Sequence, residues 1–583
     1  MGIAKQEKAL GYASTTVKAS EIIKTSPTNF AMALYGQAPG LQVGSSPGGS
    51  TSGVNMTIRG VNSITGKTQP LIVLDGVPIR DGEFNNGNYW GDQRLRGTGL
   101  LDINPEDIAT ISVLKGASAA ALYGSEAVNG VILITSKSGK GKKGYSVDVN
   151  ISTSVDHIAY LPDYQNVRGY GYPTYLNNVG QDANKFLHVT ANGVDNRVLI
   201  GTSVNYGPVF DGKPIMAWDG IVRPYSAQRN NYSNLFQTAN STMYNVAIAN
   251  STENSNTRLS ITHSENEGIS MGSQENKNNF NLTSHHQYGK KVSVDVNVNY
   301  INNHIINRPY SIDRMINNFT GMIGPFDNGN WYLNKYQTSL GYHAVYGKSG
   351  QSLTPQENIL YTGYRADIMD FVWNVKANKE DEYSDRIIAN ITTNYEIVKN
   401  LKLRSRFATD VTSRKIEDRN RNTVPLVFGN SGSFGFSSYR DNIFYGDLLL
   451  TYNKKLMPDL DFTIMGGYTA KNDKTSSESV STNGGLSTEN RFDLSSTINT
   501  LNSGGSLGQL VSDALIGTIN FNYKDYLFLE GNVRRDRYST MSPNNNTFAY
   551  PSLNSSFVFS EALHMPEFIN YGKLRGSWGI PVT

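Results

Sequence analysis

The sequence has no cysteine and no long apolar run. The missing cysteine excludes disulfides, thiolate metal sites, iron–sulfur clusters and cysteine nucleophiles. No segment approaches the roughly 18 consecutive apolar residues of a membrane-spanning helix, so helical insertion into a membrane is excluded. The first residues, MGIAKQEKAL, also lack the apolar stretch of a secretory signal.

Charge of either sign is scarce as well. Only 17% of the 583 residues are charged, with 52 Lys and Arg against 49 Asp and Glu. The only dense basic run is short, from Lys137 to Lys143, so we expect no nucleic-acid partner. The chain is instead rich in glycine, with 56 residues, and tyrosine, with 34. This composition fits either a cytoplasmic globular protein or an outer-membrane barrel, whose alternating strands give weak hydropathy.

The chain before residue 140 mixes apolar runs with short helix-like segments. The expected strands are NMTIRGV, PLIVLDGV, ATISVLKG and GVILITSK, and ASAAALYG is expected to form a helical turn between the last two. In SEIIKTSPTNFAMALYG, Ser26 and Thr28 are candidate helix caps. The pattern predicts a compact α+β unit.

After residue 144 the side chains alternate between apolar and polar. In VSVDVNVNY, Val292, Val294, Val296, Val298 and Tyr300 stand opposite Ser, Asp and Asn side chains, and YSVDVNISTS repeats the pattern. This period of two predicts strands with one apolar and one wet face. About thirteen such strands are expected. They begin near residues 145, 242, 257, 278, 292, 387, 401, 444, 460, 514, 526, 552 and 571.

The connections between these strands alternate between long and short. Long connections are expected over 155–241, 301–386, 411–443 and 470–513, and short turns near residues 250, 289, 398, 456 and 524. A soluble sandwich has no reason to gather its long loops at one end, whereas an outer-membrane barrel does. Apolar strand residues should then face lipid, with tyrosines near the strand ends forming an interfacial girdle. The lipid-facing candidates are Leu448, Leu450, Tyr452, Phe462, Ile464, Ile519, Phe521 and Tyr523.

Thirteen is an odd number, and single-chain bacterial barrels close with an even number of strands. We therefore expect this sequence to be part of a longer chain, with a signal peptide before it and further strands after it.

Several segments resemble the plug domain of SusC/RagA-type TonB-dependent outer-membrane transporters. They are MTIRGVNSITGKTQPLIVLDGVPI, INPEDIATISVLKGASAAALYG and SEAVNGVILITSKSGKGKKG. Glu126 and Val128 depart from the family pattern, which usually has Arg and Ala there, and this puts a local Arg salt bridge in doubt. We expect the matching residues to build the plug rather than to bind ligand. They are Arg59, Gly60, Asp75, Gly76, Pro78, Lys115, Gly116, Tyr123, Gly124, Asn129 and Gly130.

The resemblance implies active import of a large nutrient, an oligosaccharide or a peptide, across the outer membrane of a Gram-negative cell. It implies a SusD-like surface lipoprotein as a lid, and TonB with ExbB and ExbD as the source of energy. It also implies a barrel of about 22 strands in contact with outer-membrane lipid. A siderophore or cobalamin receptor, a surface adhesion barrel and a soluble all-β enzyme remain as alternatives.

No constellation of residues predicts catalysis, a metal site or a cofactor. The string GKGKKG, residues 139–144, matches a dinucleotide motif, but a strand follows it where a helix is needed. His285 and His286 are adjacent on a strand, so they point to opposite faces and cannot share a metal. We expect a carrier and not an enzyme.

One plug loop, DGEFNNGNYWGDQRLRGTG, mixes aromatic rings with hydrogen-bonding groups, as a sugar ring or a peptide would require. Its candidate ligand contacts are Phe84, Tyr89, Trp90, Asp92 and Arg94.

The expected organisation has four parts. A linker over 1–19 precedes the plug domain over 20–138, and a basic Gly/Lys linker over 139–144 leads into barrel strands over 145–583.

Overall fold

The computed structural model describes most of the chain. The described residues are 14–18, 32, 34–45, 53–61, 68–80, 94, 99–115, 123–141, 143–161, 163–172, 181–191, 193–202, 204–229, 231–309, 323–345, 365–563, 565–566 and 569–580. Within these ranges, no helix combines the length and the apolar character needed to cross a bilayer.

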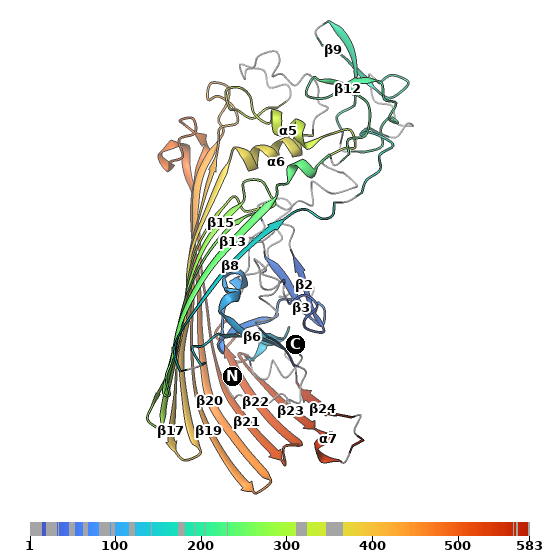
Figure 1. The fold of residues 1–583 in the computed structure, drawn as a ribbon. Coiled ribbons are helices and arrows are strands. Elements are labelled where there is room, and N and C mark those ends of the chain that lie inside the picture. Colours follow the sequence, from blue (N-terminus) through green and yellow to red (C-terminus); the bar gives the residue numbers. More distant parts are fainter. Residues whose placement is uncertain are drawn as a thin grey trace.

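A 13-stranded antiparallel sheet forms a tall curved wall, in which each strand pairs with the next along the chain (Figure 1). This confirms the predicted strand number. The strands are β8 Gly144–Asp156, β13 Ala239–Ser251, β14 Ser255–Glu267, β15 Gln274–Tyr288, β16 Val292–Ile306, β17 Lys379–Val398, β18 Leu401–Asn420, β19 Ser433–Met457, β20 Leu460–Leu486, β21 Thr497–Tyr523, β22 Leu527–Tyr538, β23 Thr547–Phe557 and β24 Leu574–Gly579.

The two faces of the wall differ as the alternation predicts. Leu448, Leu450, Ile464 and Ile519 are exposed on the convex face, each at 40% or more. The opposite residues of the same strands face the concave side, which we call the lumen face. Because apolar side chains exposed in water would be unfavourable, the convex face suits contact with lipid.

Several strands extend further than the sequence predicts. The long loops expected over 411–443 and 470–513 are mostly strand, since β18 ends at Asn420, β19 begins at Ser433, β20 ends at Leu486 and β21 begins at Thr497. These extensions contain polar runs, such as residues 474–479 of β20, in which the alternation is lost while the ladder of backbone hydrogen bonds continues. The predicted loop lengths were therefore wrong there.

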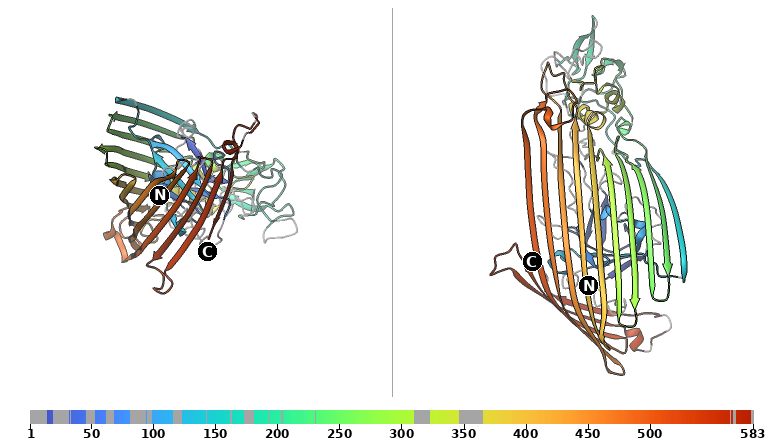
Figure 2. Two further views of the ribbon diagram at one scale, coloured as in Figure 1. Left: turned by 90° about the horizontal axis from the view of Figure 1, so that it is seen from below. Right: turned by 90° about the vertical axis from the view of Figure 1, so that its left-hand side faces the viewer.

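The plug lies on the concave side of the wall, as the two further views show (Figure 2). Its main sheet has the order β1-β6-β7-β4-β5, and a separate hairpin pairs β2 with β3. The strands are β1 Ser14–Lys18, β2 Leu41–Ser45, β3 Val54–Ile58, β4 Leu71–Leu74, β5 Val77–Pro78, β6 Ile108–Leu114 and β7 Val131–Ser136. The segment expected as a linker over 1–19 thus contributes β1, in which Val17 is buried.

An apolar core joins the plug to the wall. Val43, Met56, Ile72 and Ile111 belong to one buried cluster, together with wall residues that include Ile388 of β17. Packed apolar side chains exclude water from this contact. The plug therefore sits in the concavity as a folded body.

The long connections of the wall carry a folded unit at one end, which we call the outer module. It comprises the described residues of 157–238 and the helices α5 Gly329–Lys335 and α6 Ala366–Lys376. Its hairpins are β9 Leu187–Ala191 with β10 Val194–Val198, and β11 Pro214–Met216 with β12 Val222–Pro224. Trp218, Tyr332 and Met369 lie in its buried core. At the other end of the wall the connections are short turns, except for residues 558–573 between β23 and β24, which include α7 Phe559–Ala562.

Candidate functional site: the interface of plug and wall

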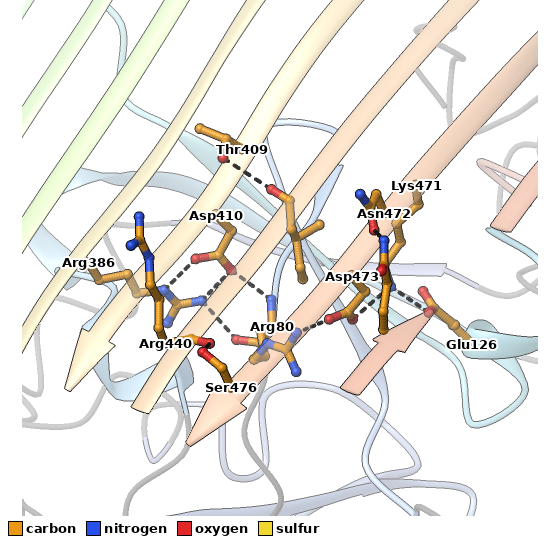
Figure 3. A network of polar contacts seen from close by, with 12 residues as sticks. Arg80, Glu126, Arg386, Thr409, Asp410, Arg440, Lys471, Asn472, Asp473 and Ser476 are labelled. Carbon is orange, nitrogen blue, oxygen red and sulfur yellow. Dashed lines mark hydrogen bonds and ion pairs between the residues drawn. The ribbon is translucent and has the colours of Figure 1, made fainter. Parts of the chain in front are cut away.

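Arg386 forms the centre of the contact between plug and wall (Figure 3). It lies on the lumen face of β17, with its side chain only 2% exposed. Its guanidinium donates to both carboxylate oxygens of Asp410 on β18, from Nε at 2.9 Å and from Nη2 at 2.7 Å. It also donates to the plug, from Nη1 to Asp102 Oδ2 at 2.7 Å. One buried cation therefore joins two wall strands to the plug.

The plug backbone completes the coordination of Arg386. Nη1 donates to the Gly99 carbonyl at 2.7 Å, and Nη2 donates to the Arg80 carbonyl at 2.8 Å. Gly99 is required by this close approach, since a Cβ there would lie 2.5 Å from Arg386 Nη1 and 2.5 Å from the Arg80 carbonyl oxygen. The backbone N–H of Arg80 also donates to Asp410, at 2.8 Å.

Further ion pairs hold the plug against β17 to β20. Arg80 pairs with Asp473 of β20, and Lys471 of the same strand pairs with Glu126 at 2.5 Å (Figure 3). Arg94 pairs with Glu380 of β17 at 2.5 Å and with Asp418 of β18 at 2.8 Å. Glu126, which departs from the family pattern, thus makes an ion pair of its own with the wall.

Next to β13, β14 and β15 the contacts are mainly neutral. Asn104 donates to Thr262 Oγ1 at 2.7 Å, and Asn279 donates to the Asp102 carbonyl at 3.0 Å. One buried ion pair, between Arg258 and Asp107 at 2.7 Å, stands on this side. The two sides of the interface therefore differ in the number of ion pairs that join plug and wall.

The arrangement holds the plug against the wall. The charged groups of the interface contact one another across the plug boundary, and these contacts compensate much of the cost of burying them. No group of three or more His, Asp or Glu side chains within the described ranges could hold a metal ion.

The predicted signature residues lie within the plug. Asp75 accepts from the backbone N–H of Ser136 at 2.9 Å and from its hydroxyl at 2.8 Å, which ties the β4–β5 turn to β7. Lys115 is buried and donates to Thr15 Oγ1 at 3.1 Å, and so connects β6 to β1. Asn129 donates to the Gln69 carbonyl at 3.4 Å. These contacts lie within the plug, and it stays a prediction that the signature residues build the plug rather than bind ligand.

The remaining signature positions occupy turns. Gly130 has a φ of +91°, and a Cβ there would lie 2.7 Å from Ile58 Cδ1, so only glycine fits without a shift. Tyr123 contributes to a cavity against β19 and β20. The other positions in turns or at strand ends are Arg59, Gly60, Gly76, Pro78 and Gly124. Gly116 lies outside the described residues.

Of the five candidate ligand contacts in the plug loop, the structure describes Arg94 alone. Phe84, Tyr89, Trp90 and Asp92 lie outside the described residues. Arg94 is engaged by the acidic side chains of β17 and β18. The wall residues that make this interface were not predicted from the sequence. The available signal was the recurrence of charged residues at alternate positions of β17 and β18, among them Arg386 and Asp410.

Known proteins resemble this chain along its whole length. Residues 6–131 match the TonB-dependent Receptor Plug Domain family. The chain is 25% identical to the TonB-dependent receptor P26 of Formosa agariphila, over 99% of this chain and 52% of that protein. It is 39% identical to the TonB-dependent receptor SusC of Bacteroides thetaiotaomicron, over 28% of this chain and 16% of that protein.

Solved structures show the same fold. The structure of the RagAB peptide transporter aligns with a TM-score of 0.69 at 17% identity, over 98% of this chain and 60% of that chain. The chain spans about half the length of P26. These relatives are receptors and transporters, in agreement with the expectation that the chain is not an enzyme.

Proposed function

We propose that this chain, which belongs to the SusC/RagA family of TonB-dependent receptors, carries out energy-driven import of a large nutrient across the outer membrane of a Gram-negative cell. The observation that carries the proposal is the buried Arg386 centre, which locks a folded plug into the concavity of the wall. Because separating buried ion pairs costs several kcal/mol, thermal motion alone opens such a closure rarely. An external source of work is therefore needed.

We further propose that TonB, with ExbB and ExbD, supplies this work and that a SusD-like lipoprotein covers the outer module. The family membership and the likeness to RagAB support these partners. The outer module adds support, since its buried cores make it a firm platform at the long-loop end of the wall.

The ligand class that we favour is an oligosaccharide, with a peptide as the second candidate. The similarity to SusC supports the first, and that to RagAB the second. The plug-loop residues Phe84, Tyr89, Trp90, Asp92 and Arg94 stay our proposed contacts for this ligand. Arg94 already lies between the plug and two wall strands, so a ligand that competes for Glu380 or Asp418 would loosen the plug.

The transport function is tested by uptake into cells that express the complete receptor. The probes are a mixture of neutral dextran-derived oligosaccharides and a tryptic digest of casein, each with a fluorescent label. We expect one of them to enter, and we expect a protonophore or deletion of TonB to abolish entry. Binding at the surface that persists without any energy-dependent uptake would instead identify an adhesion barrel. Uptake of ferric siderophore or cobalamin alone would favour the other receptor class.

A loop variant tests the proposed ligand contacts. Replacing Tyr89 and Trp90 together by Ala should weaken uptake at low probe concentration, because each aromatic ring contributes about 1 kcal/mol or more to stacking. The amount of receptor in the outer membrane should stay the same. A matched variant, Tyr145→Ala, removes an exposed aromatic ring on the convex face and should leave uptake intact. Unchanged uptake by the loop variant would remove this loop from the binding site.

A further inference from the structure

A small cavity separates the plug from the wall beside β8, β13, β14 and β15. It holds about 40 Å³ and borders Asn104 and Pro105 of the plug. Hydroxyl and amide side chains dominate its lining on the wall side, and Lys277 is its one charged lining residue. We call six of the wall residues the hydroxyl sector: Ser152, Ser154, Ser241, Thr262, Ser264 and Asn279.

A second cavity of about 40 Å³ lies between the plug and strands β19 to β22. Its lining is of the opposite kind, because it contains five charged residues. They are Glu126, Lys471, Asp513, Arg534 and Asp536. Lys471 pairs with Glu126 across the boundary at 2.5 Å. The two cavities thus have equal volumes, but one has mainly neutral polar lining residues and the other mainly charged and aromatic ones.

An uncharged ligand can replace a neutral plug–wall hydrogen bond with a hydrogen bond of its own. It cannot replace an ion pair, because it carries no charge. A sugar hydroxyl both donates and accepts, so it can replace Asn104 at Thr262 Oγ1, or the Asp102 carbonyl at Asn279 Nδ2. Separating Lys471 from Glu126 leaves charges that a neutral ligand does not compensate. The plug should therefore part from the wall first along the hydroxyl sector.

One ion pair and two contacts with a single charged partner lie on this route. Lys277 Nζ donates to the Leu101 carbonyl at 3.0 Å, and Asn150 donates to Glu106 Oε1 at 2.7 Å, and a hydroxyl can take the place of the neutral partner in each. Among the described residues, the pair of Arg258 and Asp107 is the only ion pair that joins the plug to β8, β13, β14 or β15. On β14, Arg258 lies nearer to the short-turn end of the wall than Thr262 does. A ligand that enters from the outer module would thus reach the hydroxyl sector first and this ion pair last.

We propose that an uncharged, hydroxyl-rich ligand passes the plug along the hydroxyl sector, while the ion pairs at β17 to β20 keep the plug attached to the wall. This inference rests on the proposed transport function and adds to it the route and the ligand chemistry. The plug then swings away from β8, β13 and β14 and does not leave the concavity.

The absence of native cysteine allows a direct test by thiol labelling in cells. Thr262→Cys reports on the hydroxyl sector, and Thr469→Cys is its matched control. Both threonines lie on the lumen face, are about 4% exposed and line a plug–wall cavity of about 40 Å³. With a small hydrophilic maleimide, we expect labelling of Thr262→Cys to rise about tenfold when the proton gradient and TonB are present, since labelling of a buried thiol follows the population of the open state. Labelling of Thr469→Cys should stay unchanged.

A second pair guards against a folding defect, because Thr262 accepts hydrogen bonds from Asn104 and Asn245. Ser264→Cys and Ser512→Cys are close in volume to the native residues and line the same two cavities. The neutral oligosaccharide mixture should slow labelling at Ser264→Cys in energised cells. Energy-dependent uptake with an equal rise in labelling at Thr262→Cys and at Thr469→Cys would overturn this inference alone. Failure of every probe to enter energised cells would overturn the transport function as well.

Discussion

Replacing Arg386 by Met should destabilise the closed plug by about 3–5 kcal/mol, because it leaves Asp410 and Asp102 without their cation in a buried site. The Gly99 and Arg80 carbonyls lose their donors at the same time. We expect the plug strands β6 and β7 to lose protection from hydrogen exchange by roughly two orders of magnitude or more. Cells should also become sensitive to a large hydrophilic antibiotic that the closed plug excludes.

Arg440→Met is the matched control for this variant. Arg440 lies on β19 close to the Arg386 centre, but its side chain is exposed and makes no plug contact in the described structure (Figure 3). Its replacement should change stability by about 0.5 kcal/mol or less. Equal hydrogen-exchange protection of β6 and β7 in Arg386→Met and Arg440→Met would contradict the view that Arg386 holds the plug against the wall.

A double variant distinguishes the loss of the Arg386–Asp410 ion pair from the cost of leaving a buried charge without a partner. Arg386→Met combined with Asp410→Asn removes the cation together with the anion that accepts two of its hydrogen bonds. We expect the pair of changes to cost less than the sum of the two single changes, since the double variant leaves fewer buried charges without a partner. Additive effects would mean that Arg386 and Asp410 act independently.

The lipid-facing side of the wall could be predicted from sequence because its signal is local. The alternation from Val292 to Tyr300 fixes which residues share a face, whatever the strand pairs with. The extensions of β18 to β21 could not be predicted in this way, since runs such as residues 474–479 of β20 place polar side chains on both faces of the strand. There the ladder continues through backbone hydrogen bonds that leave no trace in side-chain pattern.

The plug–wall interface depends on contacts between distant parts of the chain. Arg386 and Asp102 are 284 positions apart, and no periodicity relates them. An arginine on the lumen face of a strand can be recognised from the sequence, but its partner depends on where the plug docks. The same limit applies to the outer module, in which Trp218 and Asp327 come from different connections of the wall.

The outer module should become less stable as the pH rises from about 4 to 7. Asp327 is fully buried, and burial raises its pKa to about 7, although the Tyr332 hydroxyl, Arg365 and the Trp218 indole favour the charged form and Asp219 disfavours it. Tyr332 donates to Oδ2 at 2.9 Å and Trp218 Nε1 donates to Oδ1 at 3.0 Å. A group whose pKa is raised on folding stabilises the folded state when it is protonated. This contribution is complete below the unfolded pKa of about 4 and is lost as the pH rises through the folded value.

Between pH 5.5 and 8 the expected loss is about 2 kcal/mol, or roughly 30-fold in the opening equilibrium. Hydrogen exchange of the α5 amides, corrected for the intrinsic rate at each pH, measures this change. Asp327→Asn has the same shape and cannot ionise, so its α5 protection should not vary with pH. A pH dependence of the same size in Asp327→Asn would assign the effect to another group. Equal α5 protection of Asp327→Asn at pH 5.5 and at pH 8 would show that the Asp327 carboxyl, and not the surface charge of β9 to β12, causes the pH dependence of the outer module's stability.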